Sequence, residues 1–544
     1  MLFHSWPFLI FALVVLPLFF ALRKTRLWIP WLLAASYFFY GWWNPYYLLL
    51  VVYSSTLDYL LVTLMDHCPQ EKGTGTFCRN GPSGASHKRC LSPFPLRADP
   101  VLRGTFCGST ALALGLIGAA WAGPATLRPT LLALAVLVLL MAVGAWFASR
   151  RIWLVISLVN NLALLLFFKY ARFVVENLNQ VLSLCGCSLR LADPAALMPY
   201  GFAYVLPVGI SFFTFQSMSY TIDFYLGKVA RERNFLRFAT FVCFFPQLMA
   251  GPIERAKHLL PQFQQAPPLR LAHLTDGLSL FLVGLFKKLA LADYLAIYVD
   301  RVYGNPGSAS AAELVLATFA FAWQIYFDFS GYTDMARGLA RMMGFNLILN
   351  FNNPYLATGL GEFWTRWHIS LSTWFRDYVY IPLGGNRHGT LATYRNLFVT
   401  FLVSGIWHGA NWTFAIWGIL HALGVMVTRE LERSAVYRER VPKLVKQAGV
   451  FAYVTFAWIF FRAASLSDAL LVVGRIFRGA WSEPGIPALM LLLVGVVWLY
   501  QFMAESRFRP VLSAGPVRVT LAVGMVLYLC LCSSSGGAFI YFQF

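Results

Sequence analysis

Two aromatic segments of this 544-residue chain each contain a Trp-His pair. His368 lies in GEFWTRWHISLSTWFRDYVYIPLGGNRHG, residues 361–389, and His408 lies in SGIWHGANWTFAIWG, residues 404–418. Histidine is the side chain best suited to exchange a proton near neutral pH. The two pairs therefore predict general-base chemistry, with a hydrogen-bonded structural histidine as the alternative at each position.

The residues around His408 favour the catalytic role. Residues 397–417 are almost entirely apolar and aromatic, so His408 is expected well inside a helical bundle, where an unpaired polar group is costly. Gly405 and Gly409 flank the histidine, and glycines let a second backbone or a thin substrate approach closely. We therefore predict that His408 is a general base at the end of a tunnel.

Charged residues also interrupt the apolar segment QIYFDFSGYTDMARGLARMMG, residues 324–344. A charge inside a membrane usually faces a cavity or a partner. We predict that Asp328 and Asp334, which have aromatic neighbours, organise a polar pocket. Asp334 with Arg337, and Arg337 with Arg341, share one helix face by their spacing. A charge-compensated helix end at the cytoplasmic surface is the alternative for the two arginines.

Two further segments must position these groups. Glu362–Tyr380 is predicted to form an amphipathic helix in the membrane interface, ending before Pro382, because it mixes tryptophan and tyrosine with charged residues. The segment PQLMAGPIERAKHLLPQF, residues 246–263, contains prolines and glycine that interrupt an apolar run. It is expected to be re-entrant or an interfacial loop.

The composition predicts a membrane protein, because 59% of residues are hydrophobic and only 12% are charged. Continuous apolar runs indicate about 11–13 transmembrane helices, together with re-entrant or interfacial helices, and thus an all-α polytopic fold. The shorter alternating segments of a β-barrel are not seen. The runs lie at residues 6–22, 27–43, 45–65, 106–123, 130–148, 152–170, 201–222, 278–299, 311–329, 450–463, 486–503 and 518–534.

The net charge of +20 comes from short basic bursts between these runs. We interpret the bursts as cytoplasmic loops rather than a nucleic-acid surface, which places the amino terminus outside. The chain is predicted to be a single domain over residues 1–544. Residues 66–150 are expected to be an insertion that consists of a basic cytoplasmic loop and a helical hairpin at 106–148.

The nine cysteines predict neither a metal centre nor a disulfide framework. Cys68, Cys78, Cys90 and Cys107 are spaced too irregularly for a zinc ribbon, and reduced thiols are expected there. A disulfide between Cys185 and Cys187 is possible, but its small ring would be strained. No metal site is predicted.

Several long motifs, in order, resemble the membrane-bound O-acyltransferase superfamily. They are WTRWHISLSTWFRDYVYIPLGGNR, SGIWHGANWTFAIWG, LPVGISFFTFQSMSYTIDFY, FVCFFPQLMAGPIERAKHLLPQF and QIYFDFSGYTDMARGLARMMGFN. The resemblance is closest to the branch of the bacterial alginate O-acetyltransferase membrane subunit, with the D-alanyl transferase of teichoic acids more distant. It extends from SYFFYGWWNPYYL, residues 36–48, to the terminal FIYFQF and departs at the insertion.

The resemblance implies a helical bundle with a thinned centre. There a cytoplasmic acyl thioester, acetyl-CoA as a co-substrate rather than a tightly bound cofactor, meets an extracytoplasmic hydroxyl acceptor. It makes His408 the central catalytic residue and His368 the second. Arg337, Arg341, Arg366 and Arg387 are candidates by charge for the donor phosphates. Substrate-tunnel candidates are Asp328, Asp334, Trp367, Trp407 and Asn411.

The expected function is therefore O-acetylation of a polysaccharide, directly or through an extracytoplasmic acetyltransferase partner. The expected place is a bacterial inner membrane, with membrane lipid around the helices. Two alternatives remain. A transporter or pore would show paired repeats, which we do not find, and a structural scaffold for polysaccharide synthesis would need neither histidine.

Overall fold

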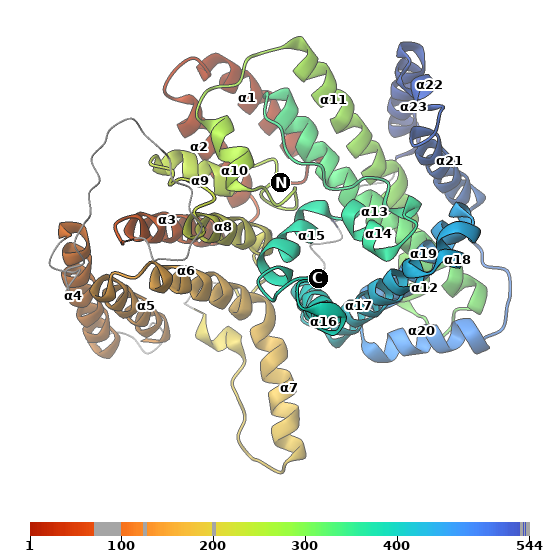
Figure 1. Ribbon diagram of the computed structural model, residues 1–544. Helices are drawn as coiled ribbons and strands as arrows, with labels where there is room; N and C mark the ends of the chain where they lie inside the picture. The colour runs from red at the N-terminus through yellow and green to blue at the C-terminus, as the bar shows by residue number, and fades with distance from the viewer. Residues whose placement is uncertain (70–98, 123–127, 199–202, 534–536, 538, 540–544) are drawn as a thin grey trace. The chain divides into compact units, whose positions relative to one another are not determined.

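A computed structural model describes the chain except residues 70–98, 123–127, 199–202, 534–536, 538 and 540–544 (Figure 1). Every regular element in the described part is a helix, which confirms the all-α fold class. The helices form two compact units, one made of residues 1, 15–249 and 253–267 and the other of residues 2–14, 250–252 and 268–544. The single domain over 1–544 stays a prediction.

The first unit contains the helices between the first membrane segment and residue 263. α1 (Trp6–Leu22) begins in the second unit and ends in the first. The others are α2 (Trp28–Gly41), α3 (Pro45–Asp66), α4 (Pro100–Ala122), α5 (Arg128–Phe147), α6 (Arg150–Leu165), the π-helical η2 (Leu166–Tyr170), α7 (Ala171–Leu184), η3 (Pro194–Leu197), α8 (Ile210–Tyr225), α9 (Phe235–Cys243), α10 (Ala256–Leu259) and η4 (Leu260–Phe263).

The hairpin expected at 106–148 is present as α4 and α5, which lie side by side (Figure 1). The basic loop before it falls mostly at residues 70–98, outside the described residues. Cys185 and Cys187, after α7, are both free thiols.

A buried carboxylate holds three helices of the first unit together. Asp58 on α3 is fully buried. It accepts hydrogen bonds from Ser157 Oγ at 2.6 Å, from Asn161 Nδ2 at 2.9 Å and from the Ser217 hydroxyl. Because Ser157 and Asn161 lie on α6 and Ser217 lies on α8, a buried polar group that would be costly alone becomes a hydrogen-bonded junction of three helices.

The segment expected to interrupt the apolar run at 246–263 does so. Helix α9 ends at Cys243, and only the short α10 and η4 follow before residue 264. Gly209 has φ +77°, and a Cβ there would lie 2.7 Å from the Leu248 carbonyl oxygen. A glycine is therefore required where the chain before α8 passes this segment.

The second unit contains the long helices that carry both Trp-His pairs. They are α11 (Leu271–Phe286), the π-helical η5 (Lys287–Ala292), α12 (Asp293–Gly304), α13 (Ala311–Met342), η6 (Pro354–Leu356), α14 (Leu360–Arg366), α15 (Ile369–Phe375), the π-helical η7 (Arg376–Tyr380), α16 (Gly389–His408), α17 (Trp412–Arg433), α18 (Ala435–Arg440), α19 (Lys443–Arg462), α20 (Leu466–Arg478), α21 (Ala488–Ala504), α22 (Arg509–Ser513) and α23 (Gly515–Cys532).

Glycines bring α11 and α13 into backbone contact. A Cβ on Gly277 would lie 2.6 Å from the Gly338 carbonyl oxygen, and one on Gly284 would lie 2.5 Å from the Gly331 carbonyl oxygen. Small residues seven positions apart on each helix therefore form one contact seam, as in tightly packed membrane helices.

Eight helices in the described part are long and apolar enough to cross a membrane, so this is a multi-pass membrane protein. They are α3, α4, α5, the continuous α6–η2–α7, α13, α17, α19 and α23, while α1 and α21 are apolar but shorter. Three other expected runs differ from plain spans. Residues 27–43 form only the 14-residue α2, α8 begins at Ile210 rather than 201, and η5 interrupts the run at 278–299.

Candidate functional site

His408 is the last residue of α16 and is only 5% exposed. Its ring meets three aromatic rings nearly edge to face, those of Trp407, Trp417 and Phe461, with centroid distances of 4.9, 5.1 and 5.3 Å. The burial predicted for His408 is confirmed. An aromatic enclosure excludes water from the imidazole, which strengthens its interactions with whatever reaches it.

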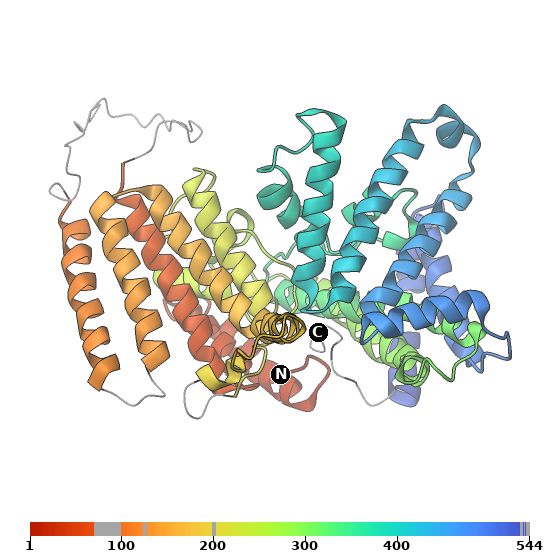
Figure 2. The same cartoon turned by 90° about the horizontal axis from the view of Figure 1, so that it is seen from below.

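Glycines position His408 against α17, and Gly405, one of the two expected to allow close approach, takes part in this contact. A Cβ on Gly418 would lie 2.5 Å from the Phe401 carbonyl oxygen, and one on Gly405 would collide with the Phe414 carbonyl oxygen. Figure 2 shows the resulting close pair, with α16 and α17 side by side. This contact brings the end of α16 beside Trp417 on the neighbouring helix.

The prediction of one continuous helix over residues 362–380 is wrong, because the helix is interrupted at His368. α14 ends at Arg366, and α15 begins at Ile369. His368 between them has φ +43°, a left-handed conformation that is uncommon for any residue except glycine. The break is stabilised from outside the segment, since the Asn350 carbonyl oxygen accepts a hydrogen bond from the Ile369 N–H at 2.9 Å.

The Asn350 side chain also orients the His368 ring. Its Oδ1 lies 3.2 Å from His368 Nδ1 and accepts from the Ser370 N–H at 3.2 Å and from Ser370 Oγ at 2.9 Å. Because an amide oxygen only accepts, Nδ1 carries the proton and Nε2 is the basic nitrogen. Complete burial lowers the pKa of His368 to about 3, so the ring is neutral at physiological pH.

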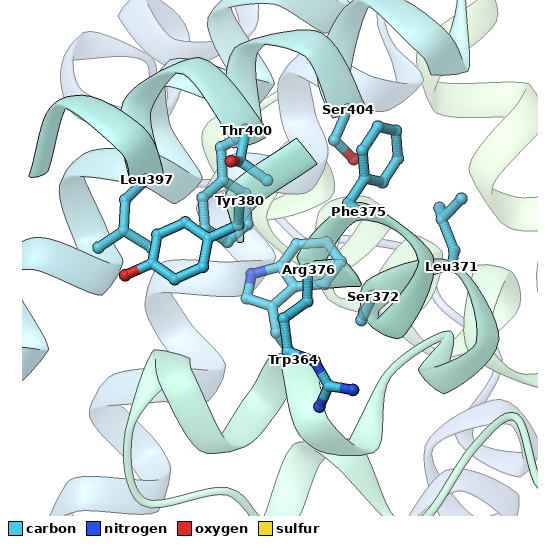
Figure 3. A pocket seen from close by; sticks show the side chains of 10 residues that line it. Trp364, Leu371, Ser372, Phe375, Arg376, Tyr380, Leu397, Thr400 and Ser404 are labelled. Atoms are coloured by element: carbon cyan, nitrogen blue, oxygen red, sulfur yellow. The ribbon is translucent and has the colours of Figure 1, made fainter. Parts of the chain in front are cut away.

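A cavity of about 220 Å³ separates the two histidine segments (Figure 3). Its lining is mainly apolar, with four aromatic rings, four hydroxyl groups and one arginine among the side chains. The lining residues are Trp364, Leu371, Ser372, Phe375, Arg376, Tyr380, Leu397, Thr400, Phe401 and Ser404.

Both histidines lie one helical turn from this lining. On α16, Leu397, Thr400 and Ser404 follow one face at spacings of three and four residues, and His408 is four residues beyond Ser404. On the other wall, Ser372 is four residues after His368, and its N–H donates to the His368 carbonyl at 2.9 Å. The two Trp-His pairs therefore end the two walls of one cavity.

A layer of tryptophans connects the two histidine segments. Trp417, which contacts His408, stacks on Trp458 with a centroid distance of 5.8 Å and an interplanar angle of 23°. Trp458 contacts Trp367, the residue before His368, at 5.1 Å. Trp367 is almost fully buried, so this tunnel candidate lies in the aromatic core of the site.

The two aspartates predicted to organise a pocket are each paired with a lysine. Lys288 Nζ lies 2.7 Å from Asp328 and 2.8 Å from Asp293, and Lys287 Nζ lies 2.7 Å from Asp334. The π-helical turn of η5 allows two consecutive lysines to reach acids on α13. These buried charges are thus compensated by partners on neighbouring segments.

The other two tunnel candidates differ in setting. Trp407 is 5% exposed and contacts Phe375 of the cavity wall at 6.3 Å. Asn411 caps α17: its side chain accepts from the Thr413 N–H at 3.1 Å and donates to the Ala464 carbonyl at 2.9 Å. Its hydrogen bonds are thus those of a helix cap.

The four arginines predicted to bind the donor do not share one setting. Arg337 pairs with Asp334 at 3.4 Å, Arg341 with Asp276 at 3.8 Å, and Arg366 with Glu362 at 2.8 Å and with Glu505. Arg387 is exposed, on the turn between η7 and α16.

The structure adds a third buried histidine that the sequence analysis missed. His421 on α17 is fully buried among aromatic rings, four residues after Trp417. Its two ring nitrogens and the indole nitrogens of Trp364 and Trp417 have no hydrogen-bond partner in the described part of the chain. Each buried unsatisfied group costs about 1–3 kcal/mol. An apolar helix with one histidine four residues from a tryptophan was the available signal.

Comparisons with known proteins identify the family. Residues 182–467 match the model of the membrane-bound O-acyltransferase family. The chain is 39% identical to a probable alginate O-acetylase of Pseudomonas putida over 74% of this chain and 86% of that protein. It is 34% identical to a peptidoglycan O-acetyltransferase of Helicobacter pylori over 71% and 76% of the two chains. It is 28% identical to a teichoic acid D-alanyltransferase of Streptococcus thermophilus over 45% and 61%.

The matched region spans His368, His408 and every residue that lines the cavity. The family and the named activities of the relatives confirm the predicted enzyme class over the transporter and scaffold alternatives. The chain belongs to the membrane-bound O-acyltransferase family and is an O-acyltransferase.

Proposed function

We propose that this enzyme transfers an acetyl group from a cytoplasmic acyl thioester, acetyl-CoA, across the membrane to hydroxyl groups of an extracytoplasmic polysaccharide. The observation that carries the proposal is the cavity whose two walls lead to His368 and His408. A largely apolar cavity with a few hydroxyl groups suits a small, uncharged acyl group. Relatives named for O-acetylation of alginate and peptidoglycan support acetyl as the group and a glycan as the acceptor.

In the proposed reaction His408 acts as the general base. It removes the proton from the acceptor hydroxyl while the hydroxyl oxygen attacks the thioester carbonyl carbon. A C–O bond forms, the C–S bond breaks, and the proton on His408 passes to the departing thiolate. General-base assistance of this kind contributes about 10²–10⁴-fold in rate.

His368 is proposed to position a reacting hydroxyl or thiol group by accepting its hydrogen bond rather than to exchange a proton. Its neutral ring is fixed by Asn350, with Nε2 as the basic nitrogen. A hydroxyl or thiol hydrogen that approaches Nε2 would find an acceptor of fixed direction. This division of roles requires both histidines, but only one of them as the base.

The donor phosphates are proposed to bind cytoplasmic arginines. Arg387 and Arg376 are exposed near the cavity segments, and Arg376 lines the cavity itself. Arg337, Arg341 and Arg366 remain candidates as members of ion pairs, because a guanidinium has several donors and one acid does not use all of them. The thioester would be consumed as a co-substrate, with no tightly bound cofactor.

We place the enzyme in a bacterial inner membrane, because its relatives in the comparison are bacterial and acetyl-CoA is cytoplasmic. The acetyl group would pass to the polysaccharide directly or through an extracytoplasmic acetyltransferase partner. Acceptor choice could reside in either protein, since a fold alone does not define the acceptor.

The test compares surface glycans by NMR from cells that carry the parental chain, the His408→Ala variant or no chain, with equal membrane levels of the two proteins. Loss of O-acetyl signals in both defective strains supports the proposal, and the shifted sugar protons identify the acceptor. Acetylation that is unchanged in all three strains rejects the glycan acceptor. If the strain without the chain loses acetylation but the His408→Ala strain keeps the parental level, the role of His408 is rejected.

A further inference from the structure

Trp364, Trp417 and His421 form a triangle of rings, here called the indole-imidazole cluster. The ring centroids are 4.6 Å apart for Trp417 and His421, 5.0 Å for Trp364 and His421, and 5.7 Å for the two tryptophans. The three residues come from α14 and α17. His421 is fully buried, so any group that binds its nitrogens must do so inside the protein.

Four polar atoms of the cluster have no hydrogen-bond partner within the described residues. They are the Nε1 atoms of Trp364 and Trp417 and both ring nitrogens of His421. An indole N–H only donates, and a neutral imidazole has one donor and one acceptor. The cluster therefore offers three donors and one acceptor, a set that suits an oxygen atom carrying partial negative charge.

The cluster contacts both the cavity lining and the general base. Trp364 lines the cavity (Figure 3), and His421 contacts another lining residue, Phe401, at 6.4 Å. On its other side Trp417 contacts His408 at 5.1 Å. A group bound by the cluster would thus be next to both the space for the acyl chain and the residue that activates the hydroxyl.

We propose that the indole-imidazole cluster binds the carbonyl oxygen of the thioester and stabilises the oxyanion that forms during transfer. When the hydroxyl oxygen bonds to the carbonyl carbon, the carbonyl π electrons move to this oxygen, which the indole and imidazole N–H groups hold. When the electrons return, the C–S bond breaks and the thiol leaves with the proton from His408. The inference rests on the proposed thioester donor.

Donors aimed at a developing oxyanion act mainly in the transition state. Removing one such donor typically lowers kcat by about 10²–10³-fold. A ground-state hydrogen bond is weaker, so its loss should lower donor affinity by only about 3–10-fold. The cluster thus predicts a large effect on kcat with a small effect on KM for the donor.

The sharpest experiment compares two donors that differ only in the carbonyl. Purified protein in lipid nanodiscs is titrated with acetyl-CoA and with S-ethyl-CoA, a thioether in which a methylene replaces the carbonyl. The parental chain should prefer acetyl-CoA by about 3–10-fold. Each of the Trp364→Phe and His421→Phe variants keeps an aromatic ring but loses its own polar atoms, so each should prefer acetyl-CoA less strongly than the parental chain does.

Trp323→Phe provides the matched control. The Trp323 indole nitrogen is also buried without a hydrogen-bond partner in the described part of the chain, but Trp323 lies on α13 and does not line the cavity. This variant should keep the parental preference for acetyl-CoA. Thermal unfolding of all variants identifies any that do not fold, and the ring-for-ring changes in Trp364→Phe and His421→Phe test the cluster independently.

The outcomes distinguish a failure of the inference about the cluster from a failure of the proposed thioester donor. Variants that keep the full parental preference for acetyl-CoA overturn the inference. A parental chain that binds both compounds equally also overturns it and leaves the thioester donor in place. A parental chain that binds neither compound overturns the proposed donor and, with it, the inference.

Discussion

His368 is held in an uncommon backbone conformation by a residue far from it in the sequence. Asn350 accepts from the Ile369 N–H through its backbone and meets His368 Nδ1 through its side chain. These contacts fix both the break between α14 and α15 and the tautomer of the ring. If His368 positions a reacting group through Nε2, then the geometry of that contact depends on Asn350.

We expect Asn350→Ala to lower the rate of acetylation about 10-fold, since one lost hydrogen bond is worth about 1 kcal/mol and the ring also loses its fixed direction. The measurement is initial-rate acetyl transfer in membrane vesicles at matched protein levels. Asn352→Ala, a change at an exposed neighbouring asparagine, is the control and should keep the parental rate. Equal rates for the two variants would contradict the positioning role.

His258 gives a prediction of pH dependence outside the transmembrane helices. Its Nδ1 lies 2.7 Å from Oε2 of the buried Glu254, and this hydrogen bond raises the pKa of His258 above the usual 6.5. A raised folded-state pKa contributes stability that is complete below about 6.5. That stability is lost as the pH rises through the higher, folded-state pKa.

The unfolding temperature of the parental protein should therefore fall between pH 6 and pH 8 by more than that of His258→Gln. The difference should be small, because the His258 side chain is 40% exposed to solvent. Differential scanning fluorimetry of both proteins in one buffer series measures it. Parallel curves for the two proteins would show that the pair does not affect stability.

At this scale the sequence predicted the two catalytic candidates but not the residues around them. His368 and His408 stood out because each follows a tryptophan in a polar-aromatic context. Asn350 could not be found, because its 18-residue separation from His368 is bridged only in the folded chain. His421 was missed because Trp364, which contacts its ring, lies on another helix, α14.

Helix packing in the second unit depends on glycines that admit no side chain. At two positions along the contact between α11 and α13, a glycine of one helix faces a glycine of the other. Any added methyl group must push one backbone away from the other, and core overpacking of this kind costs about 1–3 kcal/mol. Helix α13 also carries Asp328 and Asp334, so its contact with α11 helps to position these paired charges.

Gly284→Ala should destabilise the protein by about 1–3 kcal/mol, since the new Cβ would lie 2.5 Å from the Gly331 carbonyl oxygen. Thermal unfolding in detergent, followed by fluorescence, measures the change. Gly524→Ala on α23 is the control, because nothing lies within 4 Å of a Cβ there. A lower unfolding temperature for Gly524→Ala than for Gly284→Ala would contradict the close contact.

Helices could be predicted where the local sequence pattern determines them, but not where contacts with distant residues determine them. The α4–α5 hairpin and the interruption after α9 follow from runs of small apolar residues and from prolines and glycine. The helix predicted over 362–380 failed because hydrogen bonds from Asn350 compete with its continuation at His368. The amphipathic pattern of residues 362–380 gives no sign of this competing contact with Asn350.

For the whole molecule, composition was enough to predict a multi-pass membrane protein, and family motifs were enough to predict an acyltransferase. The number of plain spans was harder, because α2 and α8 are short and η5 interrupts a run that hydropathy treats as continuous. The cavity was not predictable at all. It exists because α16 lies against the segment of α14, α15 and η7, and no local sequence pattern indicates that contact.

The central claim is that the acyl group occupies the cavity between the two histidine segments, and filling the cavity tests it most directly. Ser404→Phe places a large side chain in the lining, whereas Val403→Phe adds the same ring at the adjacent position, whose side chain is 42% exposed. Acetyl transfer is measured for both in membrane vesicles at equal protein levels and unfolding temperatures. We predict that Ser404→Phe lowers the rate at least about 100-fold, as expected when reacting groups lose their alignment, while Val403→Phe keeps it. Parental activity in a folded Ser404→Phe protein would contradict the account.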